Sequence, residues 1–160
     1  MDGDLEYRPD HSQHPDGRFI TDLIAYLMKA LIIVGGFYNI GLIVFHLLFW
    51  RIFNWEHDLR RVSYLNRATM QVLNISLTFA FIIFSYISLA HTTELLTTSL
   101  GHSLLVLMAL FWLARSIQQI LFYKLHHWGS WAFLFLFLSG CLLYAIPAIS
   151  VIQQMPQAVS

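Results

Sequence analysis

The fold is decided by residues 67–90, which read RATMQVLNISLTFAFIIFSYISLA. The run is mostly apolar and long enough to cross a hydrocarbon core about 30 Å thick, for which a helix needs about 20 residues. Five of its polar side chains follow one another at intervals of four, three, four and seven residues: Arg67, Gln71, Asn74, Thr78 and Ser85. At about 100° per residue, these five stay within a sector of about 60°, so the segment predicts a membrane helix with one polar face.

Three further apolar segments accompany this one. The chain is 58% hydrophobic and 11% charged, whereas a soluble domain carries about 25% charged residues. We therefore predict an all-α integral membrane bundle of four transmembrane helices, in a domain at 21–153 between a flexible acidic arm at 1–20 and a C-terminal tail at 154–160. The predicted spans run approximately over Leu23–Trp50, Met70–Ala90, Leu100–Tyr123 and Trp128–Ile152.

The distribution of Lys and Arg predicts how the chain is threaded. Positive charge follows the first and third spans, whereas the second loop, His91 to Ser99, and the C-terminal tail contain neither residue. Because cytoplasmic loops carry an excess of Lys and Arg, we expect both termini on the non-cytoplasmic side of a bacterial inner (plasma) membrane. The charges that carry this prediction are Arg51, Arg60, Arg61, Arg67 and Lys124.

With this threading, polar side chains from three spans reach similar depths in the cytoplasmic half of the bundle. In lipid, such groups must face protein or water. We therefore take them as the candidate ligand-binding residues; no catalytic residue can be named. The set is Asn39, His46, Arg67, Gln71, Asn74, Arg115 and Gln118.

Two interpretations of this set remain open. In the favoured one, the chain is a non-enzymatic accessory or interaction subunit whose polar groups hydrogen-bond between helices, within a homo-oligomer or to other membrane subunits. In the alternative, they line a binding or catalytic pocket in which Arg67 and Arg115 hold an anionic or lipophilic small molecule. The sequence contains no Gly-rich phosphate loop, nucleophile elbow or His-Glu-x-x-His motif, which favours the first interpretation.

Histidines provide a third hypothesis. His46 and His126 are expected near one membrane face, and His91 and His102 near the other. One such ligand from each of two helices is how a b-type haem is held, and membrane histidines also relay protons. A metal site built on cysteine is excluded because Cys141 is the only one, and a net charge of zero disfavours nucleic acid as a partner.

Four positions resemble the membrane-associated proteins of eicosanoid and glutathione metabolism. That family has four helices, outward termini and a basic first loop, with an Arg, an Asn and a Glu opening its second helix and an Arg late in its third. Arg67, Gln71, Asn74 and Arg115 fall in similar places here, although Asn74 replaces the carboxylate. Leu104 and Met108 lie near where the family has tyrosines. The resemblance implies a similar bundle and an anion-binding cavity between helices or protomers.

Overall fold

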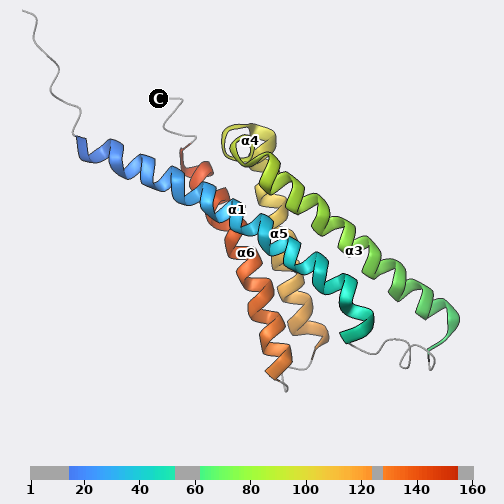
Figure 1. Ribbon diagram of the computed structural model, residues 1–160. Helices are drawn as coiled ribbons and strands as arrows, with labels where there is room; N and C mark the ends of the chain where they lie inside the picture. Colours follow the sequence, from blue (N-terminus) through green and yellow to red (C-terminus); the bar gives the residue numbers. More distant parts are fainter. Residues whose placement is uncertain (1–14, 53–61, 124–127, 155–160) are drawn as a thin grey trace, which may run out of the picture.

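The computed structural model describes residues 15–52, 62–123 and 128–154, and throughout these ranges the regular structure is helical (Figure 1). Within these ranges, four helices are long and apolar enough to cross a membrane, which confirms the predicted all-helical class with four long apolar helices. Which side the termini face stays a prediction. The helices are α1 (Pro15–Ile52), α3 (Tyr64–Ala90), α4 (Thr92–Thr97), α5 (Ser99–Phe122) and α6 (Trp128–Gln154).

The helices extend beyond the predicted spans, most clearly where α3 begins at Tyr64, six residues before the predicted Met70. α1 begins at Pro15, inside the range assigned to the N-terminal arm, while residues 1–14 and 155–160 lie outside the described part of the chain. The segment from His91 to Ser99, expected as a loop, contains α4. This turn of helix satisfies backbone groups that an open loop would expose, because the Leu95 amide donates to the His91 carbonyl.

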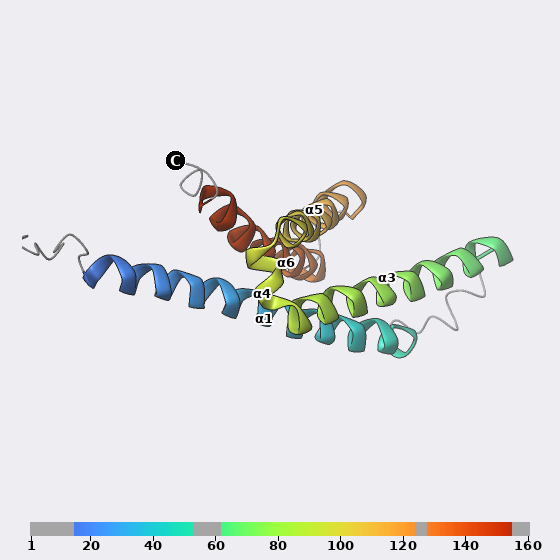
Figure 2. The same ribbon diagram turned by 90° about the horizontal axis from the view of Figure 1, so that it is seen from above.

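The four long helices form two pairs that lie in two layers (Figures 1 and 2). α1 packs along α3, α5 packs along α6, and α1 also crosses α6. We call these pairs the first and second hairpins. The closed half is the part of the bundle on the α4 side of Trp112. The open half leads from Trp112 to the helix ends at Ile52, Tyr64, Phe122 and Trp128, where the hairpins separate.

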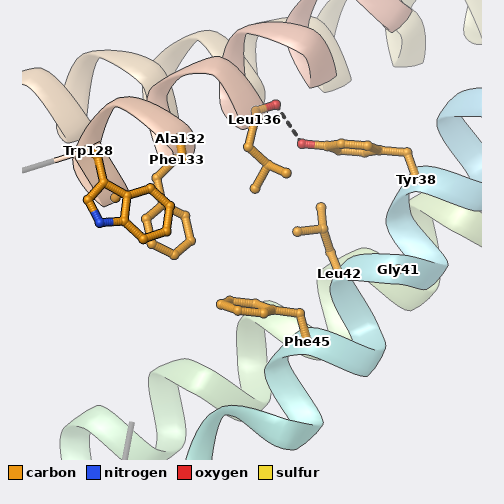
Figure 3. Close-up of a pocket in the computed structure, with 9 residues that line it drawn as sticks. Tyr38, Gly41, Leu42, Phe45, Trp128, Ala132, Phe133 and Leu136 are labelled. Atoms are coloured by element: carbon orange, nitrogen blue, oxygen red, sulfur yellow. Dashed lines mark hydrogen bonds between the residues drawn. The ribbon is translucent and has the colours of Figure 1, made fainter. Parts of the chain in front are cut away.

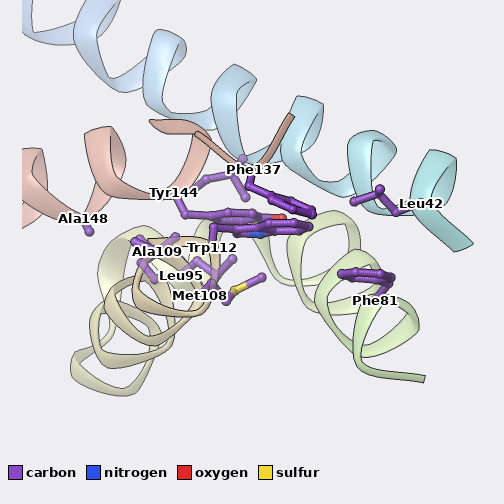
Figure 4. Close-up of a cluster of buried hydrophobic side chains, with 11 residues drawn as sticks. Leu42, Phe81, Leu95, Met108, Ala109, Trp112, Phe137, Tyr144 and Ala148 are labelled. Atoms are coloured by element: carbon purple, nitrogen blue, oxygen red, sulfur yellow. The ribbon is translucent and has the colours of Figure 1, made fainter. Parts of the chain in front are cut away.

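Aromatic rings fill the level at which the hairpins meet. Trp112 is fully buried and its indole stacks on Phe81, with ring centroids 5.5 Å apart and an interplanar angle of 4°. Phe137 of α6 and Tyr38 of α1 pack against the same indole, at 6.2 Å and 5.3 Å between centroids. One side chain of α5 therefore contacts all three other long helices at the centre of the core. Figure 4 shows Trp112 in this core together with Phe81 and Phe137.

Glycines allow the close approach of helices in the closed half. A Cβ added at Gly35 would lie 2.8 Å from the Tyr144 ring, and one at Gly36 would lie 2.6 Å from the Leu89 side chain. A Cβ at Gly140 would lie 2.7 Å from the Trp112 indole. Small residues at such crossings are typical of membrane bundles, where packing rather than water exclusion holds helices together.

Candidate functional site

His46 of α1 and Asn74 of α3, both predicted as site residues, are hydrogen-bonded to each other. The His46 Nδ1 and Asn74 Oδ1 atoms are 2.8 Å apart, and Asn74 Nδ2 donates to the His46 carbonyl oxygen at 3.3 Å. Because an amide oxygen only accepts, His46 carries its proton on Nδ1. The imidazole also lies between the rings of Phe49 and Phe81, at 5.8 Å and 5.2 Å. This pair therefore holds the two helices of the first hairpin together.

Asn39 belongs to a separate, fully buried polar group in the closed half. Its Nδ2 donates to the Gly35 carbonyl at 2.7 Å and to Tyr144 Oη at 2.8 Å. Tyr144 Oη lies 2.9 Å from Ser88 Oγ, so the group connects α1, α6 and α3. Asn39 Oδ1 is buried without a hydrogen-bond partner. The predicted site residue Asn39 thus joins the two hairpins.

Sequence reasoning missed Tyr144, the hydroxyl at the centre of this group. Its span carries no polar stripe, and the tyrosine lies among apolar residues. The available signal was chemical, since a buried tyrosine hydroxyl usually finds a hydrogen-bond partner. Gln119 behaves similarly: its Nε2 donates to Ser130 Oγ at 3.0 Å and joins α5 to α6.

Arg115 and Gln118 interact with each other on α5. Arg115 Nη1 donates to Gln118 Oε1 at 2.8 Å, and the guanidinium carbon lies 5.2 Å from the centroid of the Phe137 ring. A guanidinium within about 6 Å of an aromatic ring gains a cation–π attraction. The Arg115 side chain on α5 is therefore held against α6, within the second hairpin.

Arg67 and Gln71 continue the polar face of α3 into the open half. Both side chains are half-buried, and neither hydrogen-bonds a side chain of the described residues. The Arg67 Nε atom is buried and lacks a partner. The seven predicted residues therefore form no single hydrogen-bonded cluster within the described residues: His46 meets Asn74, Asn39 meets Tyr144, Arg115 meets Gln118, and Arg67 and Gln71 have no side-chain partner there.

The histidines proposed as haem ligands or proton carriers occupy different environments. At the α4 end, His102 Nε2 lies 3.0 Å from the Leu96 carbonyl, which can only accept, so this nitrogen carries the proton. His102 Nδ1 is buried without a partner, and His91 Nδ1 lies 3.8 Å from Glu94 Oε1. A haem iron on His102 Nε2 would require that nitrogen to release Leu96, so this end of the bundle does not fit a haem held through His102 Nε2. His126 lies outside the described residues.

A cavity within the described residues lies apart from the predicted polar residues. It is a groove of about 490 Å³ between α1 and α6 in the open half (Figure 3). Its α1 wall consists of Tyr38, Gly41, Leu42 and Phe45, and neither Arg67 nor Arg115 lines it. The Tyr38 hydroxyl donates to the Leu136 carbonyl at 2.6 Å, so the wall presents hydrocarbon to the groove.

Histidine, cysteine and carboxylate side chains do not gather in the described ranges into any group of three that would suit a metal ion. Three features of the described residues bear on function: the hydrogen-bonded pairs, the Arg67 and Gln71 side chains of α3, and the groove between α1 and α6. Comparison of the chain with protein-family models, with curated proteins and with solved structures finds no match.

Proposed function

We propose that this chain is a non-enzymatic accessory or interaction subunit of a membrane assembly, and that the open half of α3 contacts the membrane helix of a partner. The observation that carries the proposal is the division of the α3 polar face. Asn74 and Ser88 are bonded to α1 and α6, whereas Arg67 and Gln71 have no side-chain partner among the described residues.

The bonded part of the face supports a structural role for most of the predicted site. Hydrogen bonds between membrane helices contribute about 0.6 to 2 kcal/mol each. His46, Asn74 and Asn39 make such bonds, and the Asn39–Tyr144 pair is closed to solvent. Side chains committed to these contacts are poorly placed to bind a substrate or to transfer a proton.

The unbonded part of the face supports the presence of a partner. Polar groups within a bilayer are costly unless they are paired, and those of TM helices face protein or water. The Gln71 amide offers donors and an acceptor, and the Arg67 guanidinium has a buried Nε donor without an acceptor. A helix carrying a carboxylate or an amide at this depth would satisfy both side chains.

The proposed threading agrees with this placement. Arg51 and Arg67 lie at the open end. Following the positive-inside rule, we propose that this end faces the cytoplasm, in a bacterial inner membrane. Arg67 then lies within reach of the interface, and Gln71, one turn deeper, is the more decisive contact.

The proposal is tested by comparing Gln71→Leu with Asn74→Leu in the full chain, extracted in mild detergent and sized by sedimentation. We expect Gln71→Leu to reduce the assembled fraction at least tenfold without lowering the unfolding midpoint, because this side chain makes no hydrogen bond to another side chain in the described part of the chain. Asn74→Leu should lower the midpoint instead. Val72→Leu, on an exposed position of the same helix, is the control. Unchanged assembly in Gln71→Leu overturns the proposal.

The buried Nε of Arg67 also favours a second candidate function. An anionic small molecule between the hairpins would give this donor an acceptor, with Arg115 supplying the second positive charge. Glutathione is the probe suggested by the resemblance of Arg67, Gln71, Asn74 and Arg115 to the eicosanoid and glutathione family. Titration calorimetry should then show binding that Arg115→Leu weakens at least tenfold. Absence of heat for the unaltered chain contradicts this second function.

A further inference from the structure

The groove between α1 and α6 is a second surface of the open half, separate from the α3 face. Its α6 wall includes Ala132, Phe133 and Leu136, opposite Leu42 and Phe45 of α1. The Phe45 and Phe133 rings meet across it, with centroids 5.9 Å apart. The side chains in Figure 3 turn apolar surfaces toward the hollow, and the Tyr38 hydroxyl is directed to the Leu136 carbonyl. The chemistry of the walls selects a hydrocarbon occupant.

The dimensions of the groove match two hydrocarbon chains lying side by side. Tyr38 to Phe45 on α1 and Trp128 to Leu136 on α6 correspond to a length of about 11 Å at 1.5 Å per residue. A volume of about 490 Å³ over that length gives a mean cross-section of about 45 Å². Hydrocarbon chains in contact at about 4.5 Å occupy about 20 Å² each, so two chains fill this cross-section.

The groove is continuous with the surface that the spans present to lipid. Phe37 and Val44 on α1, and Trp131 and Phe135 on α6, flank the groove in sequence and are exposed large apolar side chains inside the candidate spans. A lipid chain can therefore enter sideways from the bilayer without crossing a polar surface. Trp128, the first residue of α6, is 86% exposed at the end of the groove. Tryptophan at the end of a span is typical of the headgroup level.

From these observations we propose that the groove binds the two acyl chains of one diacyl phospholipid, with the headgroup at the level of Trp128. The lipid fills the space between the separating hairpins in the open half. This inference does not depend on the proposed function, because it concerns α1 and α6 rather than Arg67 and Gln71 of α3.

Gly41 allows the groove to be filled without disturbing the fold. A Cβ added there meets no atom within 4 Å, so the leucine of Gly41→Leu has open space to occupy. Ala132→Leu narrows the groove from the opposite wall. The matched control is Ala114→Leu, which adds the same atoms as Ala132→Leu to an exposed position of α5 outside the groove.

The test is native mass spectrometry of the full chain, delipidated in detergent and titrated with a diacyl phosphatidylcholine. We expect one tightly held lipid per chain, at least tenfold weaker binding in Gly41→Leu and Ala132→Leu, and less than a twofold change in Ala114→Leu. A lysophosphatidylcholine, with one chain, should bind at least tenfold more weakly than the diacyl lipid. The unfolding midpoint of each variant is measured alongside to show that the fold is retained.

Three outcomes would overturn the proposal. The first is equal lipid binding by the unaltered chain and both groove variants. The second is equal binding of the lysolipid and the diacyl lipid, which removes the two-chain occupant. The third is a change of oligomeric state in Gly41→Leu without loss of lipid, which makes the groove a contact between chains.

Discussion

Gly36 and Gly41 lie five residues apart on α1, and their surroundings are opposite. A Cβ at Gly36 would come within 2.6 Å of Leu89, whereas one at Gly41 would meet nothing within 4 Å. Gly36 lies in the closed half, where helices approach closely. Gly41 lies in the open half and lines the groove. The same residue type thus permits packing in one region and leaves space in the other.

The hydrogen bonds differ between the halves in the same way. At the Trp112 level and on its α4 side, hydrogen bonds cross from one hairpin to the other: from Asn39 and Ser88 to Tyr144, and from Tyr38 to the Leu136 carbonyl. Farther into the open half, the His46–Asn74 and Gln119–Ser130 bonds stay within a hairpin. There the hairpins meet through apolar rings such as Phe45 and Phe133, so hydrogen bonds fix how the hairpins cross mainly in the closed half.

The largest loss of stability is expected for Gly101→Ala, which disturbs the packing of α4 on α5 in the closed half. The Cβ of Gly101→Ala would collide with the backbone of Glu94 and Leu95, which cannot rotate away as a side chain can. We expect a loss of about 3 kcal/mol in the free energy of unfolding, measured by denaturation in mixed micelles. An unfolding midpoint equal to that of the unaltered chain would show that α4 and α5 separate easily, contrary to the close packing described.

A smaller loss is expected from Tyr144→Phe. Removing the hydroxyl leaves one Asn39 N–H and the Ser88 hydroxyl without their buried partner, at a cost of about 2 kcal/mol. The Tyr144→Phe and Ser88→Ala variants, alone and combined, form a double-mutant cycle. Effects that simply add would mean that the two hydroxyls do not interact.

The pair in the first hairpin should contribute less. In a cycle of His46→Ala and Asn74→Ala, we expect a coupling of about 1 kcal/mol, because hydrogen bonds between membrane helices are individually weak. The same variants should leave the contact of the hairpins at Trp112 intact, as seen by Trp112 fluorescence in a chain whose other four tryptophans are replaced by phenylalanine. A shift of that fluorescence as large as in Tyr144→Phe would make the two halves one cooperative unit.

The sequence predicted the class of the fold well because its strongest signals are local. Apolar length reports on a span, and the spacing of Asn74, Thr78, Ser85 and Ser88 reports on one face of a helix. Thr78, Ser85 and Ser88 of that face are indeed buried. The segment at 92–97 was missed because six residues between two spans carry no periodic signal that distinguishes a turn of helix from a loop.

The site was predictable only as a set of unusual residues. The sequence singled out His46, Asn74 and Asn39, but their partners depend on how helices distant in sequence cross. Asn39 meets Tyr144, 105 positions later, and no pattern along the chain connects them. The groove was not predictable either. Nothing in the sequence distinguishes Gly41 and Gly129, which border open space, from glycines that lie in close helix contacts.

The smallest change in the free energy of unfolding is expected for Gly41→Ala, which should stabilise the protein rather than destabilise it. Glycine inside a helix is less favourable than alanine by about 0.5 to 1 kcal/mol, since its backbone loses more freedom on folding. At Gly41 the added methyl has no neighbour to displace, so the variant should unfold at a slightly higher denaturant concentration. Gly36→Ala, on the same helix, should be destabilised under the same conditions because Leu89 and Ser88 must move. A loss of stability in Gly41→Ala would mean that the open half closes on itself, and the groove would then hold no lipid.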